Sequence, residues 1–226
     1  MDAAELTIEE FNKINEISKI YFSLDGNIFE APPSMVPAYL VETGYYRSLF
    51  EKVPVDANGS YIPWITYPCI SFLEERLTRN LTVFEFGCGA STVWWSDRVK
   101  QIYSIEDNEY WYKKIKEKSP ENVKLELVDT AAYSSHILNY ENMFDIIIID
   151  GSDRFQSLKN SLSALKPGGV VILDDTDKIV YDVEQKFLYT HGFKRIGFAG
   201  LRALVGAHRL TSETSIFYRA DNCLNI

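Results

Sequence analysis

The stretch from residue 81 to residue 107 constrains the fold of this chain most strongly, because it has the pattern of a strand, a glycine turn, a helix and a second strand. Residues 81–86 form a short apolar run typical of a buried strand, and Gly87-Cys88-Gly89 follows directly. Two glycines this close together allow the backbone to turn sharply, and they leave room for a ligand where a Cβ would block it. The pattern therefore predicts a ligand site at the end of this strand.

An acidic residue at the end of the second strand indicates the kind of ligand. The helix is expected to begin near Val93, with Ser91 or Thr92 as its cap. The second strand then ends on Glu106, 21 residues after Glu85. An acid about 20 positions beyond a strand-ending glycine turn is typical of the group that binds the ribose of a nucleotide cofactor. We therefore expect an adenosine-containing cofactor at the carboxyl ends of parallel strands.

The glycine turn distinguishes between classes of adenosine cofactor. A dinucleotide-binding fingerprint has a third glycine, and that position is Thr92 here. Glu85, two positions before the first glycine, would repel a pyrophosphate and would suit a cationic ligand. The segment E-F-G-C-G-A-S-T with Glu106 downstream resembles the first two motifs of the class I S-adenosylmethionine-dependent methyltransferases. This resemblance implies S-adenosylmethionine as the cofactor.

The rest of the chain predicts the fold. Strands and helices alternate over residues 81–190, which indicates a parallel sheet with helices on both faces. Residues 144–150 include four successive isoleucines, typical of a central strand. Strands at 193–198 and 215–218 have no helix between them and should form an antiparallel edge. The fold class is therefore α/β, a Rossmann-like, doubly wound, mostly parallel seven-stranded sheet with an antiparallel last strand, as in the family that the chain resembles.

An N-terminal appendage is expected to precede this domain. Residues 1–66 are predicted to form a helical and aromatic appendage, and residues 67–226 the S-adenosylmethionine-binding domain. Apolar residues recur at helical spacing over residues 1–24, which predicts an amphipathic helix. A second helical stretch is expected over residues 37–50, interrupted near Gly44. The aromatic residues that follow either pack the appendage onto the main domain or wall the acceptor pocket, so the appendage is a candidate cap for the acceptor site.

The family resemblance assigns roles to the residues at the strand ends. It implies that Gly87 and Gly89 approach the methionine part of the cofactor, that Glu106 holds the ribose and that Asp129 lies by the adenine. Glu85 would lie near the cofactor's amino group or its water shell. The complete predicted cofactor-binding set is Glu85, Gly87, Gly89, Ser91, Thr92, Glu106, Asp129 and Asp150.

A second group of acids raises the question of a metal. Residues 165–175, with an expected turn at 166–169, are close to the L-x-P-G-G motif of the same family. Asp150, Asp174 and Asp175 resemble the Mg²⁺ ligands of small-molecule O-methyltransferases. The resemblance implies that an ion bound here, as in those enzymes, lowers the pKa of an acceptor hydroxyl. The alternative is that Asp174 and Asp175 cap the following helix and order its loop.

These assignments predict a function together with its alternatives. The leading hypothesis is methyl transfer from S-adenosylmethionine to a small-molecule acceptor, at a hydroxyl oxygen, with Asp153 or His208 as the general base. One alternative is a nucleotide-dependent oxidoreductase or sugar-modifying enzyme on a Rossmann-like fold. Another is a non-catalytic cofactor-binding protein.

The net charge predicts the kind of partner, and the N-terminal residues predict the location of the protein. A net charge of −9 argues against nucleic acid or an anionic membrane as an obligate partner. The acidic start lacks the features of a signal peptide, and no apolar run approaches the length of a membrane span. We therefore expect a cytoplasmic protein with no membrane and no nucleic acid partner. The oligomeric state is left open, and a dimer is compatible with the sequence.

Overall fold

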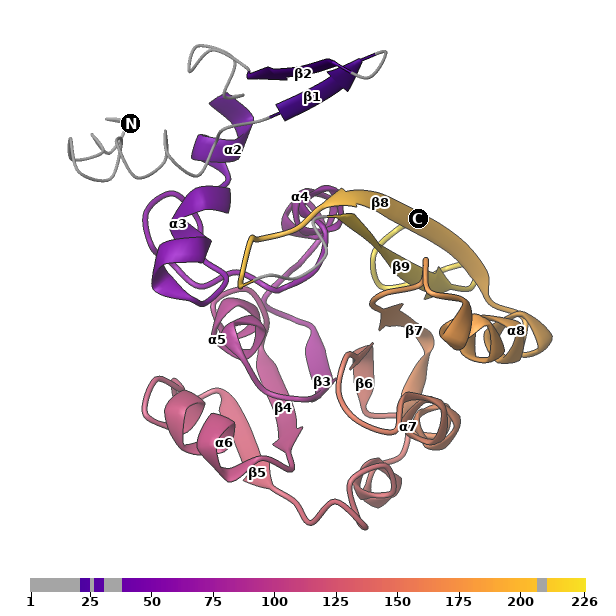
Figure 1. Cartoon of the computed structure of the whole chain (residues 1–226). Helices are drawn as coiled ribbons and strands as arrows, with labels where there is room; N and C mark the ends of the chain where they lie inside the picture. The colour runs from indigo at the N-terminus through magenta and orange to yellow at the C-terminus, as the bar shows by residue number, and fades with distance from the viewer. Residues whose placement is uncertain (1–20, 25–26, 31–37, 207–210) are drawn as a thin grey trace. The chain divides into compact units, whose positions relative to one another are not determined.

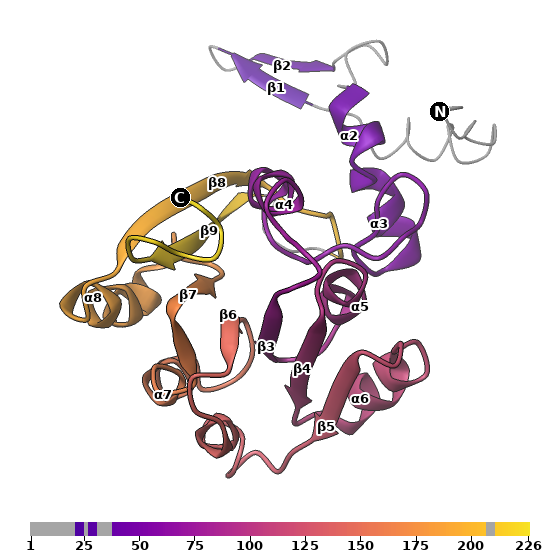
Figure 2. The same ribbon diagram turned by 180° about the vertical axis from the view of Figure 1, so that it is seen from behind.

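The structure, a computed structural model, describes residues 21–24, 27–30, 38–206 and 211–226 (Figures 1 and 2). The chain divides into two compact units. The first unit is Met1–Ser60 with Ala203–His208, and the second is Tyr61–Arg202 with Arg209–Ile226. Within the described residues, no helix combines the length and the apolar character needed to cross a membrane.

The first unit contains a small hairpin where a helix was predicted. Strand β1 (Tyr21–Leu24) pairs antiparallel with β2 (Asn27–Glu30). The predicted helix over 1–24 is therefore wrong for its last four residues, and residues 1–20 lie outside the described part of the chain. The aromatic start of β1 favours a strand, and Asp25-Gly26 between the strands is a dipeptide typical of two-residue hairpin connections.

Two short helices follow, and a glycine separates them. Helix α2 (Ala38–Glu42) and helix α3 (Tyr45–Glu51) are interrupted at Gly44, as predicted. Gly44 has a φ of +74°, and a Cβ there would lie 2.3 Å from the carbonyl oxygen of Val55. Ser48 secures this packing, because its hydroxyl lies within hydrogen-bond distance of the carbonyl oxygens of Gly44 and Val55 and accepts from the amide of Val55 at 3.0 Å. Only glycine satisfies both the left-handed backbone and the close approach.

The second unit is built on a seven-stranded sheet with the order β5-β4-β3-β6-β7-β9-β8. The strands β3 to β7 are parallel, and β9 runs antiparallel to both of its neighbours. This order confirms the predicted fold class, including the antiparallel last strand. The strands are β3 (Thr82–Phe86), β4 (Gln101–Glu106), β5 (Val123–Leu127), β6 (Phe144–Ile149), β7 (Leu165–Leu173), β8 (Lys194–Leu201) and β9 (Thr211–Tyr218).

Helices cover both faces of the sheet. Helices α4, α5 and α6 lie on one face, and α7 and α8 lie on the other (Figures 1 and 2). The alternation of strand and helix in the sequence requires this arrangement, because parallel strands need a crossover between them. The helical segments are α4 (Tyr67–Glu74), α5 (Ala90–Ser96), α6 (Glu109–Lys116), α7 (Arg154–Ser161) and α8 (Asp182–Thr190), with short 3₁₀ helices η2 (His136–Asn139) and η3 (Ile179–Tyr181).

Strand β7 begins earlier than its sequence suggests. The predicted turn at residues 166–169 is wrong, since these residues belong to the strand. The pairing of β7 with β6 shifts between Phe144 and Ile146, so the segment forms an irregular start to the strand. Gly169 allows this irregularity, because a Cβ there would lie 2.5 Å from the side chain of Leu165.

The core is centred on β6, which lies between β3 and β7. Its isoleucines are buried, as the run of four predicted. Aromatic rings fill one side of the sheet, with the rings of Phe84 and Phe144 5.0 Å apart and those of Phe84 and Phe86 4.9 Å apart. These buried, paired strands position the carboxyl edge of the sheet.

A pair of isoleucines tests this description of the core. Ile147 is fully buried in β6, whereas Ile179 in η3 is 85% exposed. Ile147→Ala should lower the free energy of unfolding by about 2–5 kcal/mol, because it removes buried methyl groups and leaves a cavity. Ile179→Ala should change it by less than about 0.5 kcal/mol. Urea denaturation of both variants measures the difference, and equal effects would contradict the assignment of β6 as the core strand.

Candidate functional site

The glycine turn after β3 contains one glycine that the backbone requires and one that leaves open space. Gly87 has a φ of +91°, and its amide donates to the carbonyl oxygen of Ile105 at 2.9 Å. Gly89 is extended, with a φ of −175°, so its backbone conformation is open to any residue. A Cβ on Gly89 would meet only the hydroxyl of Ser91, at 3.8 Å. The protein itself therefore gives no reason for a glycine at this position, whereas a ligand beside the turn would.

The carboxylate of Glu85 lies beneath this turn and is 1% exposed. The hydroxyls of Ser91 and Thr92 donate to it at 2.5 Å, and that of Ser104 donates at 2.9 Å. Burial raises the pKa of Glu85 to about 7, against the opposing effect of the three hydroxyl donors. The hydrogen bonds join β3 to α5 and β4, so Glu85 supports the turn from below.

Ser91 and Thr92 have a different role from the predicted one. Helix α5 begins at Ala90 with Gly89 as its N-cap, so the prediction that Ser91 or Thr92 caps a helix near Val93 is wrong. Both residues lie in the first turn of the helix, because their hydroxyls are drawn to the buried carboxylate of Glu85. The Thr92 hydroxyl also accepts a hydrogen bond from the amide of Gly89 at 3.0 Å.

Glu106 closes the same turn from the neighbouring strand. One carboxylate oxygen accepts from the amide of Cys88 at 2.9 Å, and the other accepts from the amide of Asn108 at 2.9 Å. A carboxylate has about four acceptor positions, so each oxygen keeps capacity for a further donor. The end of β4 therefore places a buried acceptor beside the open space at Gly89. These residues fit an adenosine cofactor with ribose hydroxyls.

A third glycine, which is not in the predicted cofactor-binding set, shapes this region. Gly151 follows β6, and a Cβ there would lie 1.9 Å from the hydroxyl of Tyr133 and 2.9 Å from the carbonyl oxygen of Phe86. Gly151 therefore lets β3 and the buried Tyr133 approach each other closely. A glycine directly after a strand-ending acid was the available signal.

Two more predicted cofactor residues lie at strand ends. Asp129 follows β5, is exposed, and accepts a hydrogen bond from the amide of Ala131 at 2.8 Å. Asp150 follows β6 and forms an ion pair with Arg154 at 2.7 Å, and its side chain is 37% exposed. Contact of either residue with a cofactor stays a prediction.

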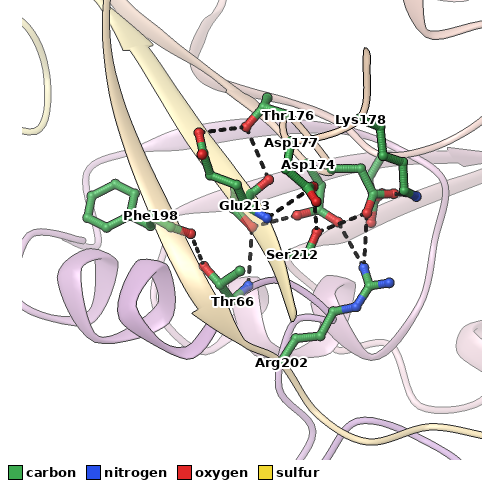
Figure 3. A network of polar contacts seen from close by, with 12 residues as sticks. Thr66, Asp174, Thr176, Asp177, Lys178, Phe198, Arg202, Ser212 and Glu213 are labelled. Atoms are coloured by element: carbon green, nitrogen blue, oxygen red, sulfur yellow. Dashed lines mark hydrogen bonds and ion pairs between the residues drawn. The ribbon is translucent and has the colours of Figure 1, made fainter. Parts of the chain in front are cut away.

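Asp174 and Asp175 follow β7 and lie in a network of polar groups. Figure 3 shows Asp174 with Lys178 and Arg202 in this network. The Thr214 hydroxyl donates to Asp174 at 2.5 Å, and Lys178 pairs with Asp175 at 2.6 Å. Arg202 lies 3.4 Å from Asp174 and 3.3 Å from Asp175. Acidic and basic side chains therefore lie together at this edge of the sheet.

The network gives the two acids opposite pKa shifts. Burial, with the charge of Asp150, raises the pKa of Asp174 to about 7, although the Thr214 hydrogen bond opposes this. Burial also acts on Asp175, but the hydrogen bond from Lys178 and the charge of Arg202 hold its pKa below the ordinary value.

The arrangement does not support the predicted magnesium site of Asp150, Asp174 and Asp175. Among the described residues, no group of three or more histidine, cysteine, aspartate or glutamate side chains could hold a metal ion. Basic side chains, chiefly Arg202, pair with these carboxylates instead. The sequence indicated these acids, but it did not show that cations from distant elements face them.

The structure describes one of the two predicted general bases. Asp153 is exposed, has a φ of +45° and precedes α7, where its carbonyl oxygen accepts from the amide of Ser157 at 2.9 Å. It lies in the loop that follows β6, at the same edge of the sheet as Asp150. His208 lies outside the described residues.

Comparison with known families identifies a matching domain. Residues 84–176 match the family described as Methyltransferase domain, a range that includes the glycine turn, Glu106 and the acids after β6 and β7. A search of curated proteins found no sequence match.

Solved structures share the fold at low identity. A precorrin-6y C5,15-methyltransferase from Geobacter metallireducens GS-15 is 16% identical with a TM-score of 0.52, over 67% of this chain and 87% of that one. A SAM-dependent methyltransferase from Methanosarcina mazei is 13% identical with a TM-score of 0.50, over 68% and 97%. A spermidine synthase from Thermotoga maritima is 12% identical with a TM-score of 0.52, over 90% and 66%. These likenesses concern the fold, which does not by itself identify a reaction.

The buried carboxyl of Glu85 predicts a dependence of stability on pH. Its pKa of about 7 in the folded state exceeds the ordinary value of 4.5, so the folded protein loses stability as pH rises between these values, and the cost is fully present above pH 7. Glu85→Gln removes this titration. The stability of the variant relative to the natural protein should therefore increase with pH across the window, by up to about 1.4 kcal/mol per pH unit.

Urea denaturation at several pH values from about 5 to about 8 measures this difference. Asp174 titrates in both proteins, so the comparison isolates Glu85. A difference in stability that does not change with pH would show that the carboxyl keeps an ordinary pKa.

Proposed function

We propose that this chain, which carries a class I S-adenosylmethionine-dependent methyltransferase domain, transfers a methyl group from S-adenosylmethionine to a hydroxyl oxygen of a small molecule. The observation that carries the proposal is the open position beside Gly89, next to the carboxylate of Glu106. Together they offer room for a ligand and an acceptor for its hydroxyl groups.

The residues around the turn divide into those that would touch the cofactor and those that hold the turn. Gly87 and Gly89 let the backbone approach the methionine part, and Glu106 would accept hydrogen bonds from the ribose hydroxyls. Asp129 after β5 would border the adenine, and Asp150 after β6 would border the reacting end. When bound, the cofactor supplies a methyl group on a positively charged sulfur.

Glu85, Ser91 and Thr92 act mainly from beneath the turn. The oxygens of Glu85 accept hydrogen bonds from both hydroxyls, so the three residues position the glycines more directly than they reach the ligand. This division of roles refines the predicted cofactor-binding set.

The acceptor must lose a proton when its oxygen is methylated. Asp153 is exposed in the loop after β6 and is the described residue that we propose as the base, with His208 as the alternative. The net charge of −9 favours a small molecule over a polyanion as the acceptor. Residues 1–66 are proposed to cap the acceptor site.

Binding and turnover test the proposal separately. Calorimetry should detect S-adenosylhomocysteine binding, and thermal shift should show stabilisation by it and not by NAD. A panel of hydroxyl compounds with methyl-labelled S-adenosylmethionine should then yield labelled product. Stabilisation by NAD alone would favour an oxidoreductase, and cofactor binding without turnover on a broad panel would favour a non-catalytic protein.

Gly89→Val tests the open position. A β-branched side chain should fill the path of the cofactor and abolish S-adenosylhomocysteine binding in calorimetry. The protein should stay folded, since Gly89 has an extended backbone and a Cβ there meets only Ser91, at 3.8 Å. Thermal unfolding checks the fold, and Gly89→Ala should have a smaller effect on affinity. Unchanged affinity in the valine variant would refute the assignment of this turn.

Glu106→Ala tests the ribose contact. The substitution should weaken cofactor binding by ~1.5–3 kcal/mol, the range for hydrogen bonds to a charged group. Glu109→Ala is the matched control, because Glu109 is an exposed acid in α6, paired with Lys113. The control should change affinity by less than about 0.5 kcal/mol. An equally small effect of Glu106→Ala would mean that another residue holds the ribose.

A further inference from the structure

One guanidinium nitrogen bridges the two acids at the end of β7. Nη1 of Arg202 lies 3.4 Å from Oδ2 of Asp174 (Figure 3) and 3.3 Å from Oδ1 of Asp175. The arginine is 8% exposed and follows β8, where its backbone pairs with Thr66. A positive charge between two consecutive carboxylates stands where a divalent cation would have to bind to be shared by them.

Hydroxyl groups and a lysine also donate to these acids. Oδ1 of Asp174 accepts from Thr214, and Oδ1 of Asp175 accepts from Ser212 at 3.0 Å. Lys178 lies 2.6 Å from Oδ2 of Asp175. Each of the four carboxylate oxygens therefore has a donor from the chain. A hard cation needs six or more oxygen ligands, and here the positive charges of Arg202 and Lys178 already lie against both carboxylates.

The arginine is held in place on its other side. Its guanidinium lies 4.9 Å from the ring centre of Trp64, within the range of a cation–π contact. A buried, desolvated arginine interacts strongly with nearby carboxylates, because little water screens the charges. Arg154 adds a third positive charge, 2.7 Å from Asp150 and 3.8 Å from Asp175.

We propose that Arg202 is a built-in counter-cation that takes the place of a divalent metal between Asp174 and Asp175. The edge therefore works without Mg²⁺, and Arg202 is a positioning residue that keeps both carboxylates in their buried places. Its removal should uncover a weak site for a divalent cation. The claim that turnover needs no Mg²⁺ rests on the proposed function. The claim that Arg202 takes the place of a cation does not.

The test compares Arg202→Met with a matched arginine. Arg98 also stacks on a tryptophan, 4.2 Å from the ring centre of Trp94, and pairs with Glu74 at 3.0 Å, but within the described part of the chain it forms no ion pair with a second carboxylate. Arg202→Met should lower the melting temperature by roughly 6–20 °C, because it leaves buried carboxylates without their partner. Millimolar Mn²⁺ should recover part of this loss. Arg98→Met and the natural protein should show no stabilisation by Mn²⁺.

Further measurements keep the proposal open to refutation if Arg202→Met does not fold. Arg202→Met with Asp174→Asn should regain stability over the single variant and lose the response to Mn²⁺, since the repulsion is gone. For the natural protein, calorimetry should detect no Mn²⁺ binding, and excess chelator should leave the melting temperature unchanged.

Three results would overturn the proposal. They are Mn²⁺ binding by the natural protein, loss of its turnover in chelator, and a folded Arg202→Met variant that responds to Mn²⁺ no more than Arg98→Met does. The proposed function is judged separately by S-adenosylhomocysteine binding. Loss of turnover in chelator with the cofactor still bound would refute the metal replacement and leave methyl transfer intact.

Discussion

Three hydroxyl groups converge on the buried carboxylate of Glu85, and the geometry of the glycine turn depends on them. Ser91 and Thr92 bring the first turn of α5 down onto the end of β3, and Ser104 ties the same carboxylate to β4. Glu106 then closes the turn from the side. Because these contacts satisfy the buried acid without a basic residue, the turn stays polar but uncrowded, and the space at its edge is left for a ligand.

At the other half of the same edge, buried carboxylates are stabilised in another way. Asp174 and Asp175 are also buried, but Arg202, Lys178 and Thr214 supply their partners. Hydroxyl donors leave one half of the edge free to receive a cofactor, whereas cations make the other half self-contained. Parallel strands bring both groups of acids to one edge, so a sheet of this kind must neutralise them somehow.

Local sequence signals failed where a distant contact decided the outcome. The cap residues predicted for α5 lie inside the helix because a buried carboxylate attracts their hydroxyls. Residues 166–169 look like a turn, yet pairing with β6 extends the strand through them. Residues 21–24 continue a helical spacing but pair with β2, since aromatic residues before Asp25-Gly26 suit a hairpin.

The sequence by itself determined the α/β alternation, the central isoleucine strand, the glycine turn and the acids at the strand ends. These follow from periodicity and from backbone freedom, which are local properties. Only the tertiary structure decided what faces those acids. Arg202 lies 27 residues beyond Asp175 and reaches it because β8 runs alongside β9, which in turn pairs with β7. A carboxylate pair that binds a metal and one that binds an arginine can look the same in a sequence, because their difference depends on which side chain the folded sheet brings within about 3–4 Å.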